Sequence, residues 1–141
     1  MEISIRQADQ SDFSSIKRLY QDWGYKGGLS PEDQIFVATW QEQLVGVVRI
    51  SFENRYHLLR GMYVSADFQR RGIGSRLLQK TSEWLQQKQL FCVPFTGLRH
   101  FYAQIGFEEI EYIKAPDFLV DRSQHYKKDG HDVTIMCRRG A

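Results

Sequence analysis

Met62 to Leu78 reads MYVSADFQRRGIGSRLL and decides the fold of this chain. Leu58 to Val64 alternates along the chain with the period of two that is typical of a strand. Beyond the glycines, apolar residues recur at helical spacing: Ile73, Leu77, Leu78, Trp84 and Leu85. The period changes within the seven residues from Ser65 to Arg71. The stretch therefore predicts a strand, a turn and a helix.

The start of this helix carries two glycines, Gly72 and Gly74. The N–H groups of a first helical turn have no intrahelical acceptor, and the helix dipole places partial positive charge there. Glycine has no side chain that would keep a ligand away from this backbone. The stretch therefore predicts an anion site that suits a pyrophosphate.

Two common phosphate motifs do not fit this stretch. A dinucleotide fingerprint needs a third Gly or Ala three residues after the second glycine, where this chain has Leu77. A Walker A loop needs Gly-Lys-Ser/Thr, which the sequence lacks. The alternative that the glycines only shape a strand-to-helix turn stays open at this point.

Two short motifs resemble those of one family, the GNAT superfamily of N-acetyltransferases. Gln69 to Gly74, QRRGIG, resembles its acyl-CoA motif Gln/Arg-x-x-Gly-x-Gly/Ala, and Met62-Tyr63-Val64 resembles the strand before it. Phe101 to Phe107, FYAQIGF, resembles the second signature, Tyr-x-x-x-Gly-Phe, in which Gly106 suits a left-handed helix end. The two motifs stand in the family's order, and the resemblance covers nearly the whole chain.

The resemblance implies acetyl-CoA as cosubstrate, and it leaves open whether the acyl group is acetyl or longer. No metal is expected, because neither Cys92 nor Cys137 has the His and Asp spacing that a metal site needs. The cofactor-binding residues expected from it are Met62, Tyr63, Val64, Gln69, Arg70, Arg71, Gly72, Ile73, Gly74 and Ser75. A polyanionic cofactor also suits the basic residues gathered nearby, which are Arg60, Arg70, Arg71, Arg76 and Lys80.

In the family, an amine attacks the thioester directly, so Cys92 and Cys137 are not required. Tyr102 occupies the signature tyrosine and is the expected general acid for the departing thiolate. A phenol with a pKa of about 10 is protonated at neutral pH and can donate. The alternative, that Tyr102 only packs beside Phe101 and Phe107, stays open.

The general base is not identified by the sequence. Several relatives carry Glu or His two or four residues before the position of Met62, on the same face of the strand, where this chain has Arg60 and Leu58. Neither accepts a proton at neutral pH. Glu53, Tyr56 and His100 are the weak candidates that remain, and a chain of water molecules is the alternative.

The acceptor is expected to be a primary amine of a small molecule, peptide or protein. The family places its acceptor pocket in the region of the 24–34 loop, where Tyr25 is a candidate substrate-binding residue. Trp23 belongs to the same region, but its helical spacing favours the core. Arg60 is a second candidate, as a ligand for a substrate carboxylate, and a solvated or phosphate-neighbouring role for it stays open.

Composition limits the other classes of function. The sequence has 141 residues, 42% of them hydrophobic, which is enough for one domain with a core, and we expect a single GNAT-like domain over residues 1–141. A net charge of +2 is too small to favour nucleic acid as a partner. We expect no signal peptide and no membrane span, hence a cytoplasmic protein, a monomer or homodimer. Cys92 and Cys137 lie in apolar runs, which favours burial over a disulfide.

The predicted fold class is α+β: a mixed, mostly antiparallel sheet of six to seven strands with helices on both faces. Strands are expected at Ile3–Ile5, Ile35–Trp40, Leu44–Phe52, Tyr56–Val64, Leu90–Phe95, Phe107–Tyr112 and Val133–Cys137. Helices are expected from Ser11 or Asp12 to Gly24, from Gly72 to about Lys88, over Leu98–Ile105 after a Thr96 cap, and from Pro116 to Gly130. Pairing should fail at Pro94, and the resemblance implies that the two central strands splay apart near this level.

The function expected is acetyl transfer from acetyl-CoA to an amine. Because the sequence shows no clear base, a non-catalytic acyl-CoA-binding sensor on the same fold is the alternative. A third interpretation, in which the glycine turn holds no ligand, also stays open.

Overall fold

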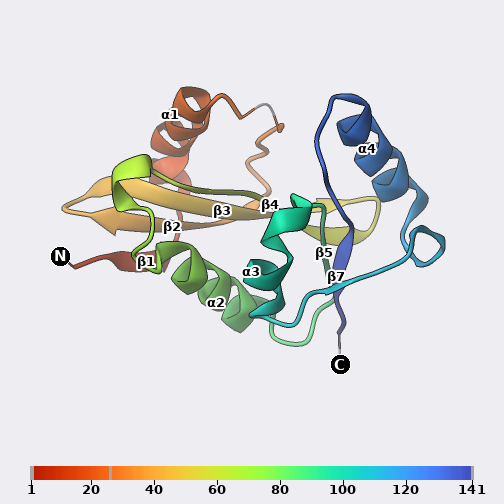
Figure 1. The fold of residues 1–141 in the computed structure, drawn as a ribbon. Helices are drawn as coiled ribbons and strands as arrows, with labels where there is room; N and C mark the ends of the chain where they lie inside the picture. The colour runs from red at the N-terminus through yellow and green to blue at the C-terminus, as the bar shows by residue number, and fades with distance from the viewer. Residues whose placement is uncertain (1, 26, 141) are drawn as a thin grey trace.

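The structure, a computed structural model, describes residues 2–25 and 27–140; Lys26 of the 24–34 loop lies outside them. The described residues form one seven-stranded sheet with helices on both faces (Figure 1), which confirms the predicted α+β class. The strands are β1 (Ser4–Gln7), β2 (Gln34–Trp40), β3 (Gln43–Glu53), β4 (Tyr56–Val64), β5 (Leu90–Cys92), β6 (Glu108–Glu109) and β7 (Met136–Arg138). The helices are α1 (Phe13–Trp23), α2 (Ile73–Leu85), α3 (Arg99–Ala103) and α4 (Asp117–Lys128). Short 3-10 helices are η1 (Gln10–Asp12), η2 (Ala66–Phe68), η3 (Thr96–Leu98) and η4 (Tyr112–Lys114).

The strand order is β1-β2-β3-β4-β5-β7-β6, and every neighbouring pair is antiparallel except β4 and β5. These two parallel strands pair through Leu58 and Phe91. Beyond that point β4 continues to Val64, whereas β5 ends at Cys92, two residues before Pro94. Pairing between the two central strands therefore ends before Pro94, as predicted.

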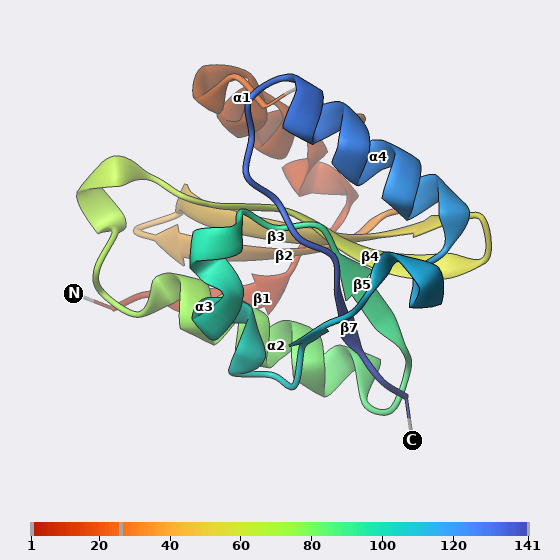
Figure 2. The ribbon, with the colours of Figure 1, turned by 45° about the vertical axis from the view of Figure 1, so that its right-hand side comes forward.

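Two layers of helices cover the sheet. Figures 1 and 2 show α1 and α4 over one face and α2 with α3 over the other. On the α2 face, Ile73, Leu77 and Leu78 pack against strand residues such as Phe36 and Val48. The opposite face has two clusters: one joins Ile16 and Tyr20 of α1 to β2 and β3, and the other joins Leu119 of α4 to β4, β5 and the chain around β7. The helical spacing read from the sequence corresponds to these buried stripes.

The first helix starts differently from the prediction. Asp12 is the N-cap residue of α1, but its side chain makes no capping bond and instead binds Arg6 at 2.7 and 2.8 Å. Asp9 supplies a side-chain cap one turn earlier, at the start of η1. Gly24 ends α1 in the left-handed region with φ of 80°, as expected of a glycine C-cap.

The boundaries in the last third of the chain are shorter than predicted. Tight 3-10 turns take up the ends of two elements: η3 replaces the start of the helix expected over Leu98–Ile105, and η4 replaces the end of the strand expected over Phe107–Tyr112. Thr96 does not cap that helix, because its hydroxyl donates to Asp132. Before β7, Val133 forms an isolated bridge with Phe95, since Pro94 has no N–H to continue a ladder.

A β-bulge interrupts β4 at Gly61. Val47 pairs with Tyr63 and Arg49 pairs with Arg60, so Gly61 and Met62 together lie opposite one residue of β3. Gly61 has φ of 63°, and its carbonyl accepts a 2.8 Å hydrogen bond from the Tyr20 hydroxyl. The bulge reverses the side-chain alternation beyond it.

The reversal overturns one prediction. Leu59 and Met62 both pack into the α2-face core although they are three residues apart, whereas Leu58 packs under α4. Arg60 alternates with Leu59 and therefore lies on the α1/α4 face. The expectation that Arg60 shares a face with Met62 is wrong, because it assumed an uninterrupted period of two.

We predict that Gly61→Ala destabilises the protein by about 2 to 4 kcal/mol. A Cβ at this position would lie 2.4 Å from the Tyr20 hydroxyl oxygen, and the positive φ is strained for alanine. Urea unfolding measures the loss. Gly28→Ala is the control, because a Cβ there meets nothing within 4 Å; equal stability of both variants would mean that the bulge relaxes without cost.

Candidate active site

A cavity of about 460 Å³ lies where the end of β4, the glycine turn, the start of α2 and α3 come together. Its lining residues are Met62, Val64, Phe68, Gln69, Arg70, Gly72, Ile73, Gly74, Ser75, Leu98, Phe101 and Tyr102. The cavity thus brings together Tyr102 and all of the predicted cofactor-binding residues except Tyr63 and Arg71. The sequence reasoning missed Phe68, Leu98 and Phe101, although Phe68 and Phe101 directly adjoin the two motifs.

The glycine turn has an unusual backbone. Arg70 and Gly72 both adopt positive φ, at 64° and 76°, on either side of Arg71. Such alternation turns successive N–H groups toward one concave side, which is a common way to bind an anion. The Gln69 side chain braces the turn by donating to the Val64 carbonyl at 2.9 Å. Strain at Arg70, a non-glycine residue, fits a backbone shaped for a ligand.

The first turn of α2 opens onto this cavity without a cap. Its N-cap residue is Gly72, which has no side chain to accept from the N–H groups of Ile73, Gly74 and Ser75. Gly74 also lies close to α3: a Cβ there would be 3.0 Å from the ring of Phe101. Glycine is therefore favoured at position 72 by the positive φ and at position 74 by the close approach of the Phe101 ring.

Beyond Leu58, the side of β4 that faces β5 has no strand paired with it in the described residues. Met62 and Val64 lie on this free edge, and their side chains line the cavity. Unpaired main-chain N–H and C=O groups of a strand edge can bind an extended, amide-containing ligand. The cavity therefore joins an uncapped helix start at one end to a free strand edge at the other.

Tyr102 lies at the cavity from α3. It is 8% exposed and packs edge-on against Phe101 and Phe107, with ring centroids 5.0 and 6.1 Å away. Its hydroxyl has no hydrogen-bond partner among residues 2–25 and 27–140. Burial raises the pKa of Tyr102 above its ordinary value, and the neighbouring Cys92 raises it further. The phenol is thus a protonated donor at neutral pH, and it packs in the core as well.

On the opposite face of β4, aromatic side chains form a stack. Trp23 stacks on Tyr63 at 4.6 Å and on Tyr25 at 5.0 Å between ring centroids. Trp23 is 39% exposed, so the core placement favoured by its helical spacing is wrong. Tyr63 points into this stack and not into the cavity, because the bulge turns it to the α1 face.

Arg49 is a buried charge beneath the stack that the sequence reasoning did not single out. Its guanidinium lies 2.6 Å from the Asp33 carboxylate, donates to the Tyr25 hydroxyl at 3.1 Å and is 1% exposed. An arginine inside the apolar run of β3 was the available signal, since arginine is almost never fully buried unless it is paired. Tyr25, Asp33 and Arg49 together hold the loop after α1 against the sheet.

Glu53 lies beside two arginines at the hairpin end of β3. Arg122 of α4 binds it at 2.7 Å, Arg60 approaches at 3.3 Å, and the Ser51 hydroxyl donates at 2.8 Å. Burial alone would raise the pKa of Glu53, but the hydrogen bonds of Arg122 and Ser51 and the charges of both arginines outweigh it and lower the pKa to about 2. So weakly basic a carboxylate is a poor general base.

The remaining base candidates also lie away from the cavity. Tyr56 packs against Phe91 and Phe118 on the α4 side, and His100 is exposed on α3. Neither is among the cavity-lining residues. The structure thus brings no predicted base to the cavity. Among the described residues, no group of His, Cys, Asp or Glu side chains has the arrangement of a metal site.

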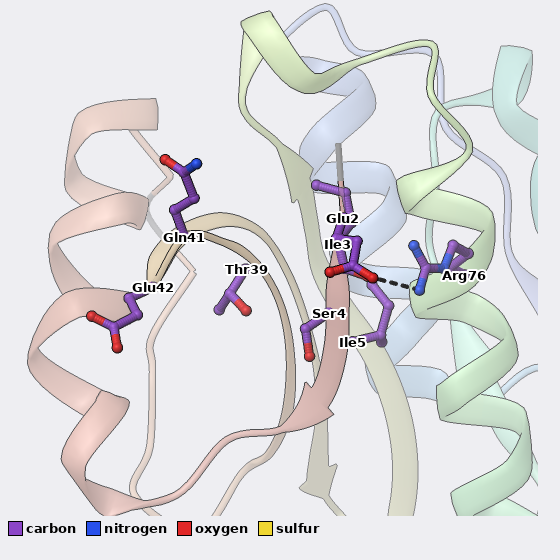
Figure 3. A pocket seen from close by; sticks show the side chains of 8 residues that line it. All are labelled: Glu2, Ile3, Ser4, Ile5, Thr39, Gln41, Glu42 and Arg76. Atoms are coloured by element: carbon purple, nitrogen blue, oxygen red, sulfur yellow. Dashed lines mark hydrogen bonds between the residues drawn. The ribbon is translucent and has the colours of Figure 1, made fainter.

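A second cavity, of about 570 Å³, lies at the β1 edge (Figure 3) and shares no lining residue with the first. Arg76 of α2 reaches into it and donates to the Ile3 carbonyl at 2.9 Å. The predicted basic cluster is therefore divided: Arg76 binds β1 and Arg60 binds Glu53, while Arg70 stays at the first cavity.

We predict that Glu53→Gln destabilises the protein at pH 7 by about 1 to 2 kcal/mol, since solvent screens this partly exposed cluster. A depressed carboxyl pKa stabilises the fold above the ordinary value of 4.5, and this contribution disappears as the pH falls through about 2. Urea unfolding from pH 7 to pH 2 should show the two curves converging. Glu83→Gln, on the exposed side of α2, is the control; a pH-independent difference would contradict the charge-based account.

Comparison with known proteins identifies the family. Residues 31–109, more than half of the chain, match the model of the acetyltransferase (GNAT) domain. The chain therefore belongs to the GNAT superfamily of acetyltransferases, as its two motifs predicted. A comparison with curated proteins finds no match.

Solved structures share the fold. A GNAT-family acetyltransferase from Streptococcus pneumoniae has a TM-score of 0.72 at 18% identity, covering 99% of this chain and 100% of that one. N-acetylglutamate synthase from Neisseria gonorrhoeae, complexed with coenzyme A and N-acetyl-glutamate, has a TM-score of 0.68 at 21% identity; the match covers 100% of this chain but 36% of the synthase. Arabidopsis thaliana Naa50 with the bisubstrate analogue CoA-Ac-MVNAL has a TM-score of 0.67 at 15% identity, covering 97% and 98%.

No helix in residues 2–25 and 27–140 is both long and apolar enough to cross a membrane.

Proposed function

We propose that this chain, working as one acetyltransferase domain, transfers the acetyl group of acetyl-CoA to a primary amine by direct attack. One observation carries the proposal: the uncapped start of α2, the free edge of β4 and Tyr102 all lie on the same cavity. Membership of the GNAT superfamily supports acetyl transfer. The structural neighbour from Neisseria gonorrhoeae, complexed with coenzyme A, supports the choice of cosubstrate.

The cavity suits the two chemically different parts of coenzyme A. The N–H groups of Ile73, Gly74 and Ser75 would bind the pyrophosphate, with Arg70 beside it. The main chain of Met62 to Val64 would bind the amides of the pantetheine arm as a strand edge binds a peptide. When bound, acetyl-CoA supplies an acetyl thioester that is open to attack by an amine.

The chain's own groups favour direct transfer over an acyl-enzyme. Burial raises the pKa of Cys92 well above its ordinary value and also raises that of Cys137, so neither thiol is a ready nucleophile. Tyr102 would donate its proton to the departing thiolate. The amine would approach from the α1/α4 face, because the cofactor would fill the cavity on the other face, and we propose that water there takes up the amine proton.

A thiol-release assay tests this function, with acetyl-CoA and a panel of polyamines, amino acids, aminoglycosides and lysine peptides. We expect acceptor-dependent release of free thiol above the background without acceptor. Calorimetry with acetyl-CoA alone is the paired measurement. Tight binding without release from any amine would favour the non-catalytic sensor, which the lack of an identified base also suggests. No binding would leave the glycine turn as a purely structural element.

A further inference from the structure

The α1/α4 face carries a surplus of positive charge close to β4. Two guanidinium groups, from Arg60 and Arg122, share the single carboxylate of Glu53. The side chains of Arg60, Arg122 and Glu53 are 19, 24 and 27% exposed, so the cluster is partly desolvated but still accessible to water. The neighbouring Arg49 does not add to the surplus, since Asp33 neutralises it.

The two arginines have N–H donors that Glu53 does not use. Arg60 makes one hydrogen bond to Glu53, and Arg122 makes two, one of them at 3.5 Å. A guanidinium group offers five N–H donors in a planar fork that matches a carboxylate. A second carboxylate can therefore join this cluster without removing Glu53, and it would balance the charge.

The cluster lies within reach of the main chain around Met62, where the acetyl transfer is proposed to take place and which we call the transfer point. Arg60 directly precedes Gly61, and Met62 lies two positions further along the strand, or about 7 Å of chain. Its side chain runs away from the bulge toward Glu53, which pairs with Tyr56 at the far end of β4. The space between the transfer point and the guanidinium groups is therefore on the order of 10 Å.

We infer that the acceptor is a primary amine that carries a carboxylate several bonds away, and that Arg60 and Arg122 bind this carboxylate. The inference rests on the proposed acetyl transfer and names its substrate class. Arg60 comes from β4 and Arg122 from α4, so the site forms only when both elements are packed together. The amine is placed at the thioester while its carboxylate is held at the cluster.

Two matched series of acceptors test this. The first is the ω-amino acids, with one to six methylenes between amine and carboxylate, and the second is the alkylamines of the same lengths. We expect kcat/KM for the longer ω-amino acids to exceed that for their alkylamine partners by about tenfold or more, because charge-assisted hydrogen bonds to a carboxylate are strong. The preference should shrink as the chain shortens and the carboxylate no longer reaches the arginines.

Variants separate binding from a structural role. In Arg60→Gln and in Arg122→Gln the ratio of the two kcat/KM values should fall toward one, through a rise in KM for the ω-amino acid. Arg122→Lys keeps the charge and should retain part of the preference. Arg6→Gln breaks the ion pair between Arg6 of β1 and Asp12 of η1, and it should leave the ratio unchanged. If Arg122→Gln does not fold, Arg60→Gln decides, because it keeps the Arg122–Glu53 pair.

Each outcome bears on the inference. A length-dependent preference that both glutamine variants remove would support it. Alkylamines accepted as well as ω-amino acids, or a preference that survives both variants, would overturn the acceptor class and leave the acetyltransferase standing. No thiol release from either series, together with release from another amine of the panel, would overturn the acceptor class alone. No release from any amine would overturn the acceptor class together with the proposed transfer.

Discussion

Gly74→Glu is expected to weaken acetyl-CoA binding by about a hundredfold or more, which corresponds to about 2.7 kcal/mol. The Cβ alone would lie 3.0 Å from the ring of Phe101, so the new side chain has to turn into the cavity or displace α3. Its negative charge would then lie beside the first-turn N–H groups of α2, where the pyrophosphate is proposed to bind. Isothermal titration calorimetry with acetyl-CoA measures the loss.

Two further variants show which property of Gly74 matters. Gly74→Ala adds bulk without charge and should weaken binding less than Gly74→Glu. Gly28→Glu adds the same charge where a Cβ meets nothing within 4 Å, and it should leave the affinity unchanged. If Gly74→Glu folds and binds acetyl-CoA as tightly as the parent protein, the assignment of this helix start as the pyrophosphate site is wrong.

Tyr102→Phe is expected to lower kcat about a hundredfold while the affinity for acetyl-CoA stays nearly the same. The variant keeps the ring that packs on Phe101 and Phe107 and removes only the hydroxyl, which has no partner among the described residues. The change therefore removes a proton donor with little effect on the cavity. Steady-state kinetics with a saturating acceptor, beside calorimetry, measure the two quantities separately.

The pH profile gives a second check on Tyr102. Burial raises the pKa of Tyr102 above its ordinary value of 10, so the protonated donor persists to higher pH than a free phenol would. In the parent protein kcat should show no decline from loss of the acid below about pH 10. Tyr112→Phe, an exposed tyrosine that contacts Lys127 and does not line the cavity, is the control. An unchanged kcat in Tyr102→Phe would return this residue to a packing role.

Local patterns predicted much of the fold. The change of period between Val64 and Ile73 located the end of β4 and the start of α2, because strand and helix alternations are set by neighbouring residues. The glycine turn likewise follows from local chemistry, since a positive φ and an uncapped helix start at Gly72 need no distant partner. The same holds for the end of α1 at Gly24.

The predictions that were wrong depended on contacts between distant segments. The face assigned to Arg60 was wrong because the bulge at Gly61 shifts the alternation, and that bulge is held by Tyr20 of α1, which is 41 residues away along the chain. Trp23 was assigned to the core by its spacing, yet it stacks on Tyr63 at the surface of the sheet. Neither contact leaves a signal in the local sequence.

By itself, the sequence determined the family, the order of the elements and the uncapped glycine backbone at the start of α2, since each depends on residues within one turn or strand. The tertiary structure alone decided which side chains share the cavity and which lie on the α1/α4 face. Packing of α3 placed Tyr102 beside the glycine turn, and packing of α4 brought Arg122 to Glu53 and Arg60. Contacts between such distant elements are set by the hydrophobic burial of whole faces. Which side chains lie on a face depends on the strand register, and that register is a property of the assembled sheet.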